Sequence, residues 1–399
     1  MEMKKLLEDS SAYLMNTYNR FPVVLRKGRG LKVWSSDGKE YHDFLGGVAV
    51  NILGHCHPKV VISIQKQAQR LIHVSNYFHI EPQIRLAKIL VENSFADRVF
   101  FCNSGTEANE AAIKLCRKYF SDQPGHKRFE IITALNSFHG RTLASLSATG
   151  QEKFQKGFEP LVPGFRHVEF NDVDALEKAI TKDTCAVLLE PLQGEGGVKI
   201  PDPDYLSEVR RICDHHGILL VLDEVQTGIG RTGKLFAYEH FGITPDIMTV
   251  AKGLGGGVPI GAMLATEKVA AAFQPGTHAS TFGGNPLVCA AAATTLEVLL
   301  EDGFLLDQCR RMGAYLKKGL EDLKKEFPSI IANVRGMGLL VGMEIVRDGA
   351  PIVKACMERG ILINCTAGNV LRFMPPLIVT EKEIDHLLDV LGQVFDRTP

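Results

Sequence analysis

The stretch ILLVLDEVQTGIGRTGKL (residues 218–235) joins an apolar run to an acidic residue and a glycine-rich loop. Its first part, residues 218–223, is a short continuous run of aliphatic residues that ends in Asp223. Such runs are typical of strands that are buried on both faces of a parallel sheet. Further runs of this kind alternate with helical stretches at 98–102, 130–135, 185–190, 246–251 and 261–265. The alternation predicts an α/β fold with a large, mostly parallel sheet that is covered by helices on both faces.

The glycine-rich loop matches two patterns that bind nucleotide phosphates. Residues 228–233 fit G-x-G-x-x-G, and residues 228–234 fit G-x-x-x-x-G-K. The second pattern requires Ser or Thr after the lysine, but this chain has Leu235 there. The first requires an acidic residue about 20 positions further on, and Asp246 comes too early. We therefore expect a flexible loop at the rim of a cleft rather than a nucleotide site.

The composition is that of an ordinary globular protein. The chain has 399 residues, of which 45% are hydrophobic and 23% charged, and this length suggests about two domains. Its formal net charge of −1 gives no general attraction to nucleic acid or to an anionic membrane. No apolar run approaches the ~20 residues of a membrane span, and the N-terminus lacks the apolar core of a signal peptide. Nine scattered cysteines without C-x-x-C spacing favour a reducing compartment. We expect a cytoplasmic protein that binds neither nucleic acid nor a membrane.

The C-terminal part has a different pattern of apolar residues from the central part. Its apolar runs are short and lie at 338–346, 360–365 and 370–376. With helical stretches between them, these runs predict a smaller α+β domain. We expect an N-terminal segment at 1–55 that packs with the small domain, a large domain at 56–285 and the small domain at 286–399.

Polar or reactive residues follow the C-terminal ends of several predicted strands. They are the segment Asn103–Thr106, Glu190, Asp223 and Lys252. In open α/β sheets, ligands bind outside the carboxyl ends of the strands. We therefore expect these separated segments to line one cleft.

Three of these segments have both a simple structural interpretation and a chemical one. In NSGTEANE (103–110), Ser or Asn can cap a helix whose free N–H groups bind an anion, or the capped helix binds nothing. Asp223 can hold a proton on a heterocyclic nitrogen, as enzymes do for pyridoxal phosphate, or it can cap the next turn. Lys252 can reach the surface, or burial or a nearby positive charge can lower the pKa of its amine and make it a Schiff-base nucleophile.

Two further segments contribute candidates. In NSFHGRT (136–142), Phe138 can stack on a planar cofactor or pack in the core. Arg141 can hold a substrate carboxylate or lie on the surface. In HCHP, His55 and His57 lack a third ligand, so we expect a structural role and no metal site.

Taken together, these segments resemble the class-III pyridoxal-phosphate aminotransferases, which have the aspartate-aminotransferase-like fold (fold type I). The resemblance covers nearly the whole chain, and the order and spacing of its motifs are highly specific. The motifs are NILGHCHP (51–58), NSGTEANE (103–110), FHGRTLASLSATG (138–150), EPLQGEGG (190–197), LDEVQTGIGRTG (222–233), AKGLGGGVPIGA (251–262), STFGGNP (280–286) and LRFMPPL (371–377).

This resemblance implies a set of contacts with the cofactor pyridoxal 5'-phosphate. Lys252 would form the Schiff base with the cofactor, and Asp223 would pair with the pyridine nitrogen. Gln226 would contact the ring hydroxyl, and Phe138 would stack on the ring. Gly105 and Thr106, at their helix start, would bind the phosphate.

The resemblance also implies a homodimer with shared active sites. Thr281 would complete the phosphate site of the other subunit, and Ser280 would lie near the substrate. Arg141 would hold a carboxylate of the acylated donor. Paired with Glu195, Arg372 would be neutralised while an ω-amine donor is bound; once released, it would take the α-carboxylate of glutamate.

Within the class, residues 147–165 and the three glycines at 255–257 are most similar to the acetylornithine-type members. That similarity implies N2-acetyl-L-ornithine as amino donor and 2-oxoglutarate as acceptor, a step of arginine biosynthesis. Members that act on ornithine, 4-aminobutyrate, succinylornithine or succinyl-diaminopimelate are the alternatives. Two hypotheses outside this class are a nucleotide-binding enzyme that uses GIGRTGKL (228–235) and a non-catalytic binding protein.

Overall fold

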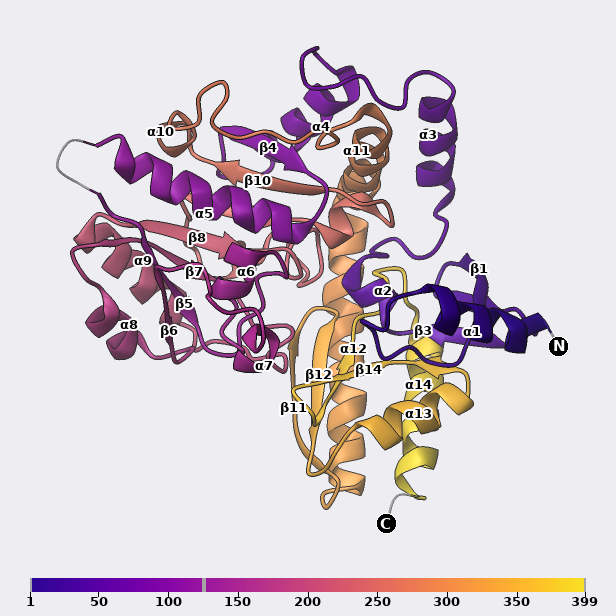
Figure 1. Ribbon diagram of the computed structural model, residues 1–399. Helices are drawn as coiled ribbons and strands as arrows, with labels where there is room; N and C mark the ends of the chain where they lie inside the picture. The colour runs from indigo at the N-terminus through magenta and orange to yellow at the C-terminus, as the bar shows by residue number, and fades with distance from the viewer. Residues whose placement is uncertain (1, 124–126, 398–399) are drawn as a thin grey trace.

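A seven-stranded sheet forms the centre of the computed structural model, which describes residues 2–123 and 127–397. The sheet has the order β4-β10-β9-β8-β7-β5-β6 (Figure 1). The bounds are β4 Arg98–Cys102, β5 Glu130–Ala134, β6 Phe165–Val168, β7 Thr184–Leu189, β8 Leu219–Asp223, β9 Ile247–Val250 and β10 Gly261–Ala265. Strands β5 to β9 pair in parallel, whereas β10 pairs antiparallel with both β4 and β9. The predicted mostly parallel sheet is confirmed.

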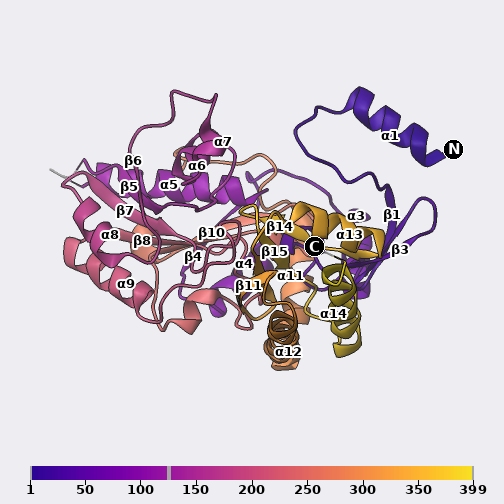
Figure 2. The ribbon, with the colours of Figure 1, turned by 90° about the horizontal axis from the view of Figure 1, so that it is seen from below.

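Two apolar cores cover the two faces of this sheet. The helices around it are α5 Gly105–Ser121, α6 Leu143–Ala148, α7 Glu152–Gln155, α8 Val173–Ala179, α9 Tyr205–His216 and α10 Glu267–Ala270. Leu219 and Val221 point into the core under α5, while Leu220 and Leu222 point into the core under α8 and α9. Figure 2 shows α5 and the pair α8 and α9 on opposite sides of the strands. Cover on both faces explains why the strands are continuous apolar runs.

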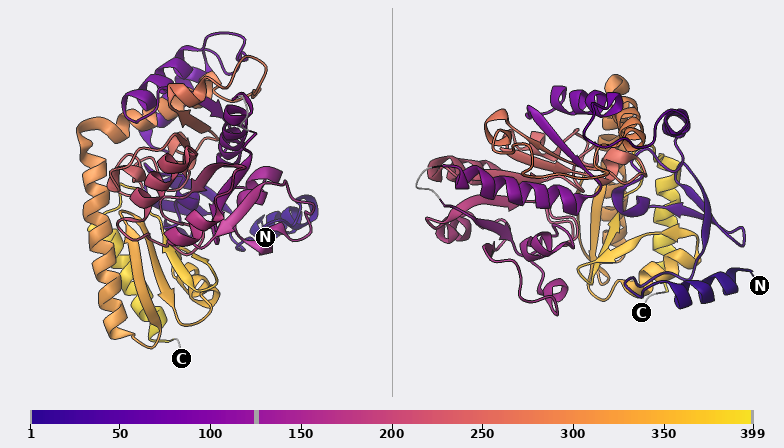
Figure 3. Two further views of the ribbon diagram at one scale, coloured as in Figure 1. Left: turned by 90° about the vertical axis from the view of Figure 1, so that its left-hand side faces the viewer. Right: turned by 45° about the horizontal axis from the view of Figure 1, so that its top comes forward.

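The C-terminal part forms a second, antiparallel sheet with the order β11-β12-β15-β14. Its strands are β11 Ile331–Met337, β12 Leu340–Ile345, β14 Asn364–Thr366 and β15 Val370–Phe373. The helices of this part are α11 Pro286–Leu300, α12 Phe304–Glu326, α13 Ala350–Glu358 and α14 Glu381–Phe395. The long helix α12 runs along the sheet (Figure 3) and packs on β11 and α14.

The N-terminal part shares a third sheet with the C-terminal part. The elements are α1 Glu2–Tyr13, β1 Leu25–Arg29, β2 Lys32–Ser35, β3 Glu40–Asp43, α2 Gly46–Ala49, α3 Pro58–Ala68, α4 Glu81–Glu92 and β13 Ile361–Leu362. Strand β13 pairs in parallel with β3, in the sheet order β1-β2-β3-β13. In Figure 2, α1 stands away from the rest of the chain. The three predicted domain boundaries stay a prediction. Among the described residues, no helix combines the length and the apolar character needed to cross a bilayer.

Four strands differ from the sequence expectation. The run at 360–365 is divided between β13 and β14, which belong to different sheets, because the chain crosses from one sheet to the other at Ile363. Strand β6 is FRHV, an edge strand without a continuous apolar run, and β11 is IANVRGM, in which most residues are not fully buried. Neither strand carries the pattern of a strand buried on both faces.

The expectation of a flexible rim loop at 228–233 is wrong, because every residue from Gly228 to Gly233 is buried. Arg231 is 1% exposed. Its Nη1 donates hydrogen bonds to the carbonyl oxygens of Leu339, at 3.0 Å, and Pro375, at 2.5 Å. The loop therefore packs between the central sheet and the C-terminal sheet.

Candidate active site

A cavity of about 740 Å³ opens at the carboxyl ends of the central strands. All four segments expected to converge there line its wall, namely Asn103–Thr106, Glu190, Asp223 and Lys252. Phe138, Arg141, Glu195 and Gln226 line it as well. The strand order explains the convergence, because β4, β7, β8 and β9 run in the same direction and end at one edge.

Lys252 begins the short 3-10 helix η2 (Lys252–Gly255) directly after β9. Its backbone has φ = 43°, a left-handed conformation that is uncommon for a residue with a side chain and is found at functional sites. Burial, together with the positive charge of Arg372, lowers the pKa of the Lys252 amine to about 8. Both expected causes are therefore present, and the neutral, nucleophilic amine is accessible near neutral pH.

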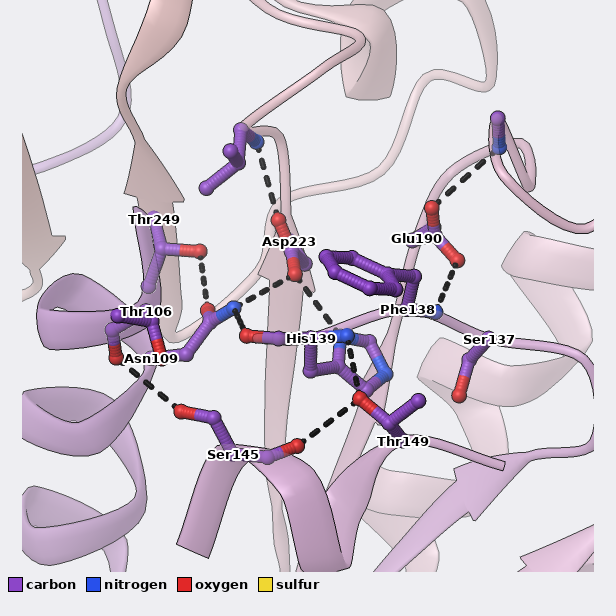
Figure 4. Close-up of polar contacts among 12 residues, drawn as sticks. Thr106, Asn109, Ser137, Phe138, His139, Ser145, Thr149, Glu190, Asp223 and Thr249 are labelled. Atoms are coloured by element: carbon purple, nitrogen blue, oxygen red, sulfur yellow. Dashed lines mark hydrogen bonds and ion pairs between the residues drawn. The ribbon is translucent and has the colours of Figure 1, made fainter. Parts of the chain in front are cut away.

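Asp223 is held by a buried network of polar groups (Figure 4). Its Oδ2 accepts hydrogen bonds from Asn109 Nδ2 at 2.7 Å and pairs with His139 Nδ1 at 2.8 Å. Its Oδ1 accepts from the Val225 N–H at 3.0 Å. Thr249 Oγ1 in turn donates to Asn109 Oδ1 at 2.7 Å. With 3% of its surface exposed, Asp223 presents an oriented carboxylate to the cavity.

The sequence reasoning assigned no role to Asn109, His139 or Thr249. Asn109 and His139 lie inside quoted motifs, and Thr249 interrupts the apolar strand DIMTVA. A polar residue at a buried strand or helix position needs a partner, and that was the only signal available. The shared partner, Asp223, is far away in sequence.

The start of α5 has the features expected of an anion site. Ser104 caps the helix by accepting a hydrogen bond from the Glu107 N–H at 3.3 Å. The helix is 17 residues long, so its dipole and its free N–H groups favour an anion at Gly105 and Thr106. A Cβ on Gly105 would lie 2.6 Å from Val225 Cγ1, which explains the glycine.

Phe138 and Arg141 lie on the loop after β5. Phe138 packs edge-on against Phe154, with 5.9 Å between the ring centroids. The guanidinium of Arg141 lies 5.4 Å from the centroid of Phe138 and 3.9 Å from that of Phe154, and its side chain is exposed. The two rings position a cation at the cavity wall that remains open to a carboxylate.

Glu190 connects two loops of the cavity. Its Oε2 accepts a hydrogen bond from the Phe138 N–H at 3.2 Å, and its Oε1 accepts from the Gly194 N–H at 3.3 Å. Burial raises the pKa of Glu190 to about 7. The sequence placed Glu190 at a strand end without a role; the structure shows that it ties the Phe138 loop to the loop that carries Glu195.

Arg372, on β15, forms an ion pair with Glu195, with 2.9 Å between Nη1 and Oε2. Arg372 is 1% exposed and does not line the cavity, whereas the side chain of Glu195 is 33% exposed and does. Glu195 and Gln226, which both line the cavity, contact the Arg372 guanidinium.

Comparisons with known proteins identify the family. Residues 13–395 match the aminotransferase class-III family. The chain belongs to aminotransferase class III.

Relatives of this class-III aminotransferase align over almost its full length. It is 56% identical to the acetylornithine aminotransferase of Caldanaerobacter subterraneus subsp. tengcongensis, over 96% of this chain and 98% of the relative. It is 52% identical to that of Methanocaldococcus jannaschii, over 99% of both chains. The crystal structure of ornithine aminotransferase from Toxoplasma gondii ME49 superposes with a TM-score of 0.94 at 37% identity, covering 98% of this chain and 94% of that one. Acetylornithine aminotransferase from Elizabethkingia anophelis superposes with a TM-score of 0.88 at 33% identity, covering 99% of each.

Class-III aminotransferases have fold type I and use pyridoxal phosphate, and a second Toxoplasma gondii ornithine aminotransferase structure has partial occupancy of that cofactor at its active site. The residues of this class-III aminotransferase fit the cofactor. A helix start suits its phosphate, the Asp223 carboxylate suits a protonated ring nitrogen, and the Lys252 amine suits its aldehyde.

Ser280 and Thr281 do not line this chain's own cavity. Ser280 Oγ accepts hydrogen bonds from Asn103 Nδ2 at 3.3 Å and from the Gly283 N–H at 2.9 Å. Thr281 is exposed. Their predicted roles, like those of the other site residues of this class-III aminotransferase, stay predictions.

Proposed function

We propose that this class-III aminotransferase transfers the ω-amino group of N2-acetyl-L-ornithine to 2-oxoglutarate, forming N-acetylglutamate 5-semialdehyde and glutamate. The observation that carries the proposal is the ion pair of Arg372 with Glu195. In this pair, a carboxylate that lines the cavity neutralises a buried guanidinium. Such a pair serves an enzyme that must accept one substrate by its ω-amine and another by its α-carboxylate. The relatives named acetylornithine aminotransferase support this choice of donor.

Lys252 and Asp223 would perform the proton chemistry. When bound, pyridoxal phosphate supplies an aldehyde that takes up the amino group and a ring that stores electrons. Lys252 Nζ, whose pKa is about 8, would take the proton from the donor carbon that bears the ω-amine and return a proton later. The Asp223 carboxylate, fixed by Asn109 and His139, would stabilise a positive charge on the ring nitrogen.

Arg141 and Arg372 would bind the carboxylates of the two substrates. Arg141 is exposed at the cavity wall and would hold a carboxylate of the donor. In the first half-reaction Glu195 keeps Arg372 neutralised, so the ω-amine end of the donor meets no net positive charge. In the second, rotation of Glu195 would expose Arg372 to the α-carboxylate of 2-oxoglutarate.

A homodimer would complete the site. The side chains of Tyr77, Phe78 and Phe282 are exposed, and the ring centroids of His73 and Phe282 are 5.2 Å apart. Asn76 Nδ2 also donates to the carbonyl oxygens of Ser280, at 3.2 Å, and Gly283, at 2.9 Å. An exposed apolar patch of this kind is typical of an interface. Pairing two copies through this patch would bring Thr281 to the partner's phosphate site. The nine free cysteines support a cytoplasmic location.

Two measurements test the proposal. With added pyridoxal phosphate, the purified protein should show the visible absorbance of a Schiff base, which borohydride reduction and Lys252→Ala should each abolish. The kcat/KM for N2-acetyl-L-ornithine should then exceed the values for ornithine and 4-aminobutyrate. A colourless protein would exclude the cofactor chemistry, and a clear preference for 4-aminobutyrate would exclude the donor.

A further inference from the structure

Arg372 has two neutral acceptors besides Glu195. Its Nε donates to Asn364 Oδ1 at 3.3 Å, and its Nη1 donates to Gln226 Oε1 at 3.3 Å. Asn364 lies directly opposite Arg372 in the pairing of β14 with β15, so the two side chains stand on the same face of the sheet. On the other side of Arg372, the paired residue of β12 is Gly342, which offers no side chain.

The backbone that carries Glu195 is held in place. Thr366 Oγ1 donates to the Glu195 carbonyl oxygen. Arg335 donates from Nη2 to the Gly197 carbonyl oxygen at 2.7 Å and from Nε to that of Val198 at 3.0 Å. If the proposed function is correct, the switch between the two half-reactions would therefore be a rotation of the Glu195 side chain on a fixed loop.

When Glu195 rotates away, the contacts with Asn364 and Gln226 remain. Both are carbonyl oxygens of neutral amides, so they orient the guanidinium without cancelling its charge. A carboxylate at position 364 would instead neutralise Arg372 permanently and would repel an incoming α-carboxylate. The neutrality of residue 364 thus decides whether Arg372 can act in the second half-reaction.

We propose that Asn364 is a positioning residue that fixes the Arg372 guanidinium, while leaving its charge intact, for the α-carboxylate of the acceptor. This inference rests on the proposed function, because it assigns Asn364 to the glutamate and 2-oxoglutarate half-reaction alone. Asn364 does not line the cavity and would act through Arg372.

Asn364→Asp tests this directly, because it exchanges an amide for a carboxylate of almost the same shape. In single-turnover measurements, the KM for 2-oxoglutarate should rise about tenfold or more, whereas kcat/KM for N2-acetyl-L-ornithine should stay within about twofold of the wild-type value. Asn364→Ala, which removes the acceptor but adds no charge, should raise the same KM less and leave kcat unchanged. Gln393→Glu is the control for net charge, since it adds a carboxylate at an exposed position of α14.

Calorimetric binding of glutarate, a dicarboxylate that cannot react, separates this inference from the proposed function. The holoenzyme should bind glutarate, and Asn364→Asp should weaken that binding about tenfold or more, even if N2-acetyl-L-ornithine proves not to be the donor. Equal losses in both half-reactions, unchanged glutarate affinity in Asn364→Asp, or no glutarate binding by the wild type would each overturn the assignment. If Asn364→Asp does not fold, Asn364→Ala decides by its KM for 2-oxoglutarate, and an unchanged value overturns it.

Discussion

The hydroxyl of Thr249 is expected to stabilise both the protein and its cofactor site. It lies on β9, is 0% exposed, and donates to Asn109 Oδ1 at 2.7 Å. Thr249→Val keeps the shape and leaves that oxygen buried without a donor, which costs about 1–3 kcal/mol of unfolding free energy. Thr133 provides the matched control, because it lies on β5 of the same sheet, is also 0% exposed, and its hydroxyl has no hydrogen-bond partner among the described residues. Thr133→Val should therefore leave the unfolding free energy unchanged or raise it by up to about 1–3 kcal/mol.

Urea titrations of the wild type and both variants provide the assay, at one protein concentration and one excess of pyridoxal phosphate, because ligand and subunit association both shift stability. The unfolding free energies of the two variants should differ by about 1 kcal/mol or more. Thr249→Val should also bind pyridoxal phosphate more weakly, since Asn109 then holds Asp223 less firmly, whereas Thr133→Val should bind it as the wild type does. If Thr249→Val were as stable as the wild type while Thr133→Val lost stability, the network would not stabilise the site.

Three further predictions follow from other contacts of the cavity. Gly140→Ala should lower the affinity for pyridoxal phosphate about tenfold or more, because the new Cβ would lie 2.2 Å from Thr106 Oγ1 and would displace a predicted phosphate-binding residue. Gly157→Ala should leave that affinity unchanged, since Gly157 is also at positive φ but its Cβ would meet nothing within 4 Å. The cofactor-free protein should gain stability as the pH rises from about 8 towards the ordinary lysine value, since the lowered pKa of Lys252 lets the folded state release its proton first; Lys252→Met should abolish that gain in a pH series of urea titrations. Glu195→Gln should shift the ratio of kcat/KM values towards glutamate over N2-acetyl-L-ornithine by about tenfold, because Arg372 then keeps its full charge; an unchanged ratio would argue against the switch.

The central sheet and the reactive residues at its strand ends could be predicted because strands that are buried on both faces are continuous apolar runs in the sequence. A strand such as β8 must be apolar throughout, so the charged residue at its end stands out. The same holds for Lys252 after β9. Strand β6 is not a continuous apolar run, because it lies at the sheet edge and its side chains Arg166 and His167 are not fully buried.

The buried loop at 228–233 could not be predicted, because its partners are distant in sequence. Glycines indicate a turn, but they do not reveal whether the turn faces water or another part of the chain. Here the decisive contacts are those of Arg231 with the carbonyl oxygens of Leu339 and Pro375. Local patterns report local geometry, and only the folded chain shows which backbone oxygens lie near a given arginine.

The same limit explains why the partners of Asp223 were missed while Asp223 itself was not. A lone carboxylate at the end of an apolar strand is anomalous in sequence, and its need for partners follows from the free energy of burying a charge. Which groups meet that need depends on the approach of α5 and of the loop after β5, so Asn109 and His139 emerge only in the folded chain. The consequence is a division of roles at this cavity. The residues predicted to contact the cofactor stand out in the sequence, whereas the residues that hold them, such as Asn364 beside Arg372 in our proposal, are visible only through their contacts.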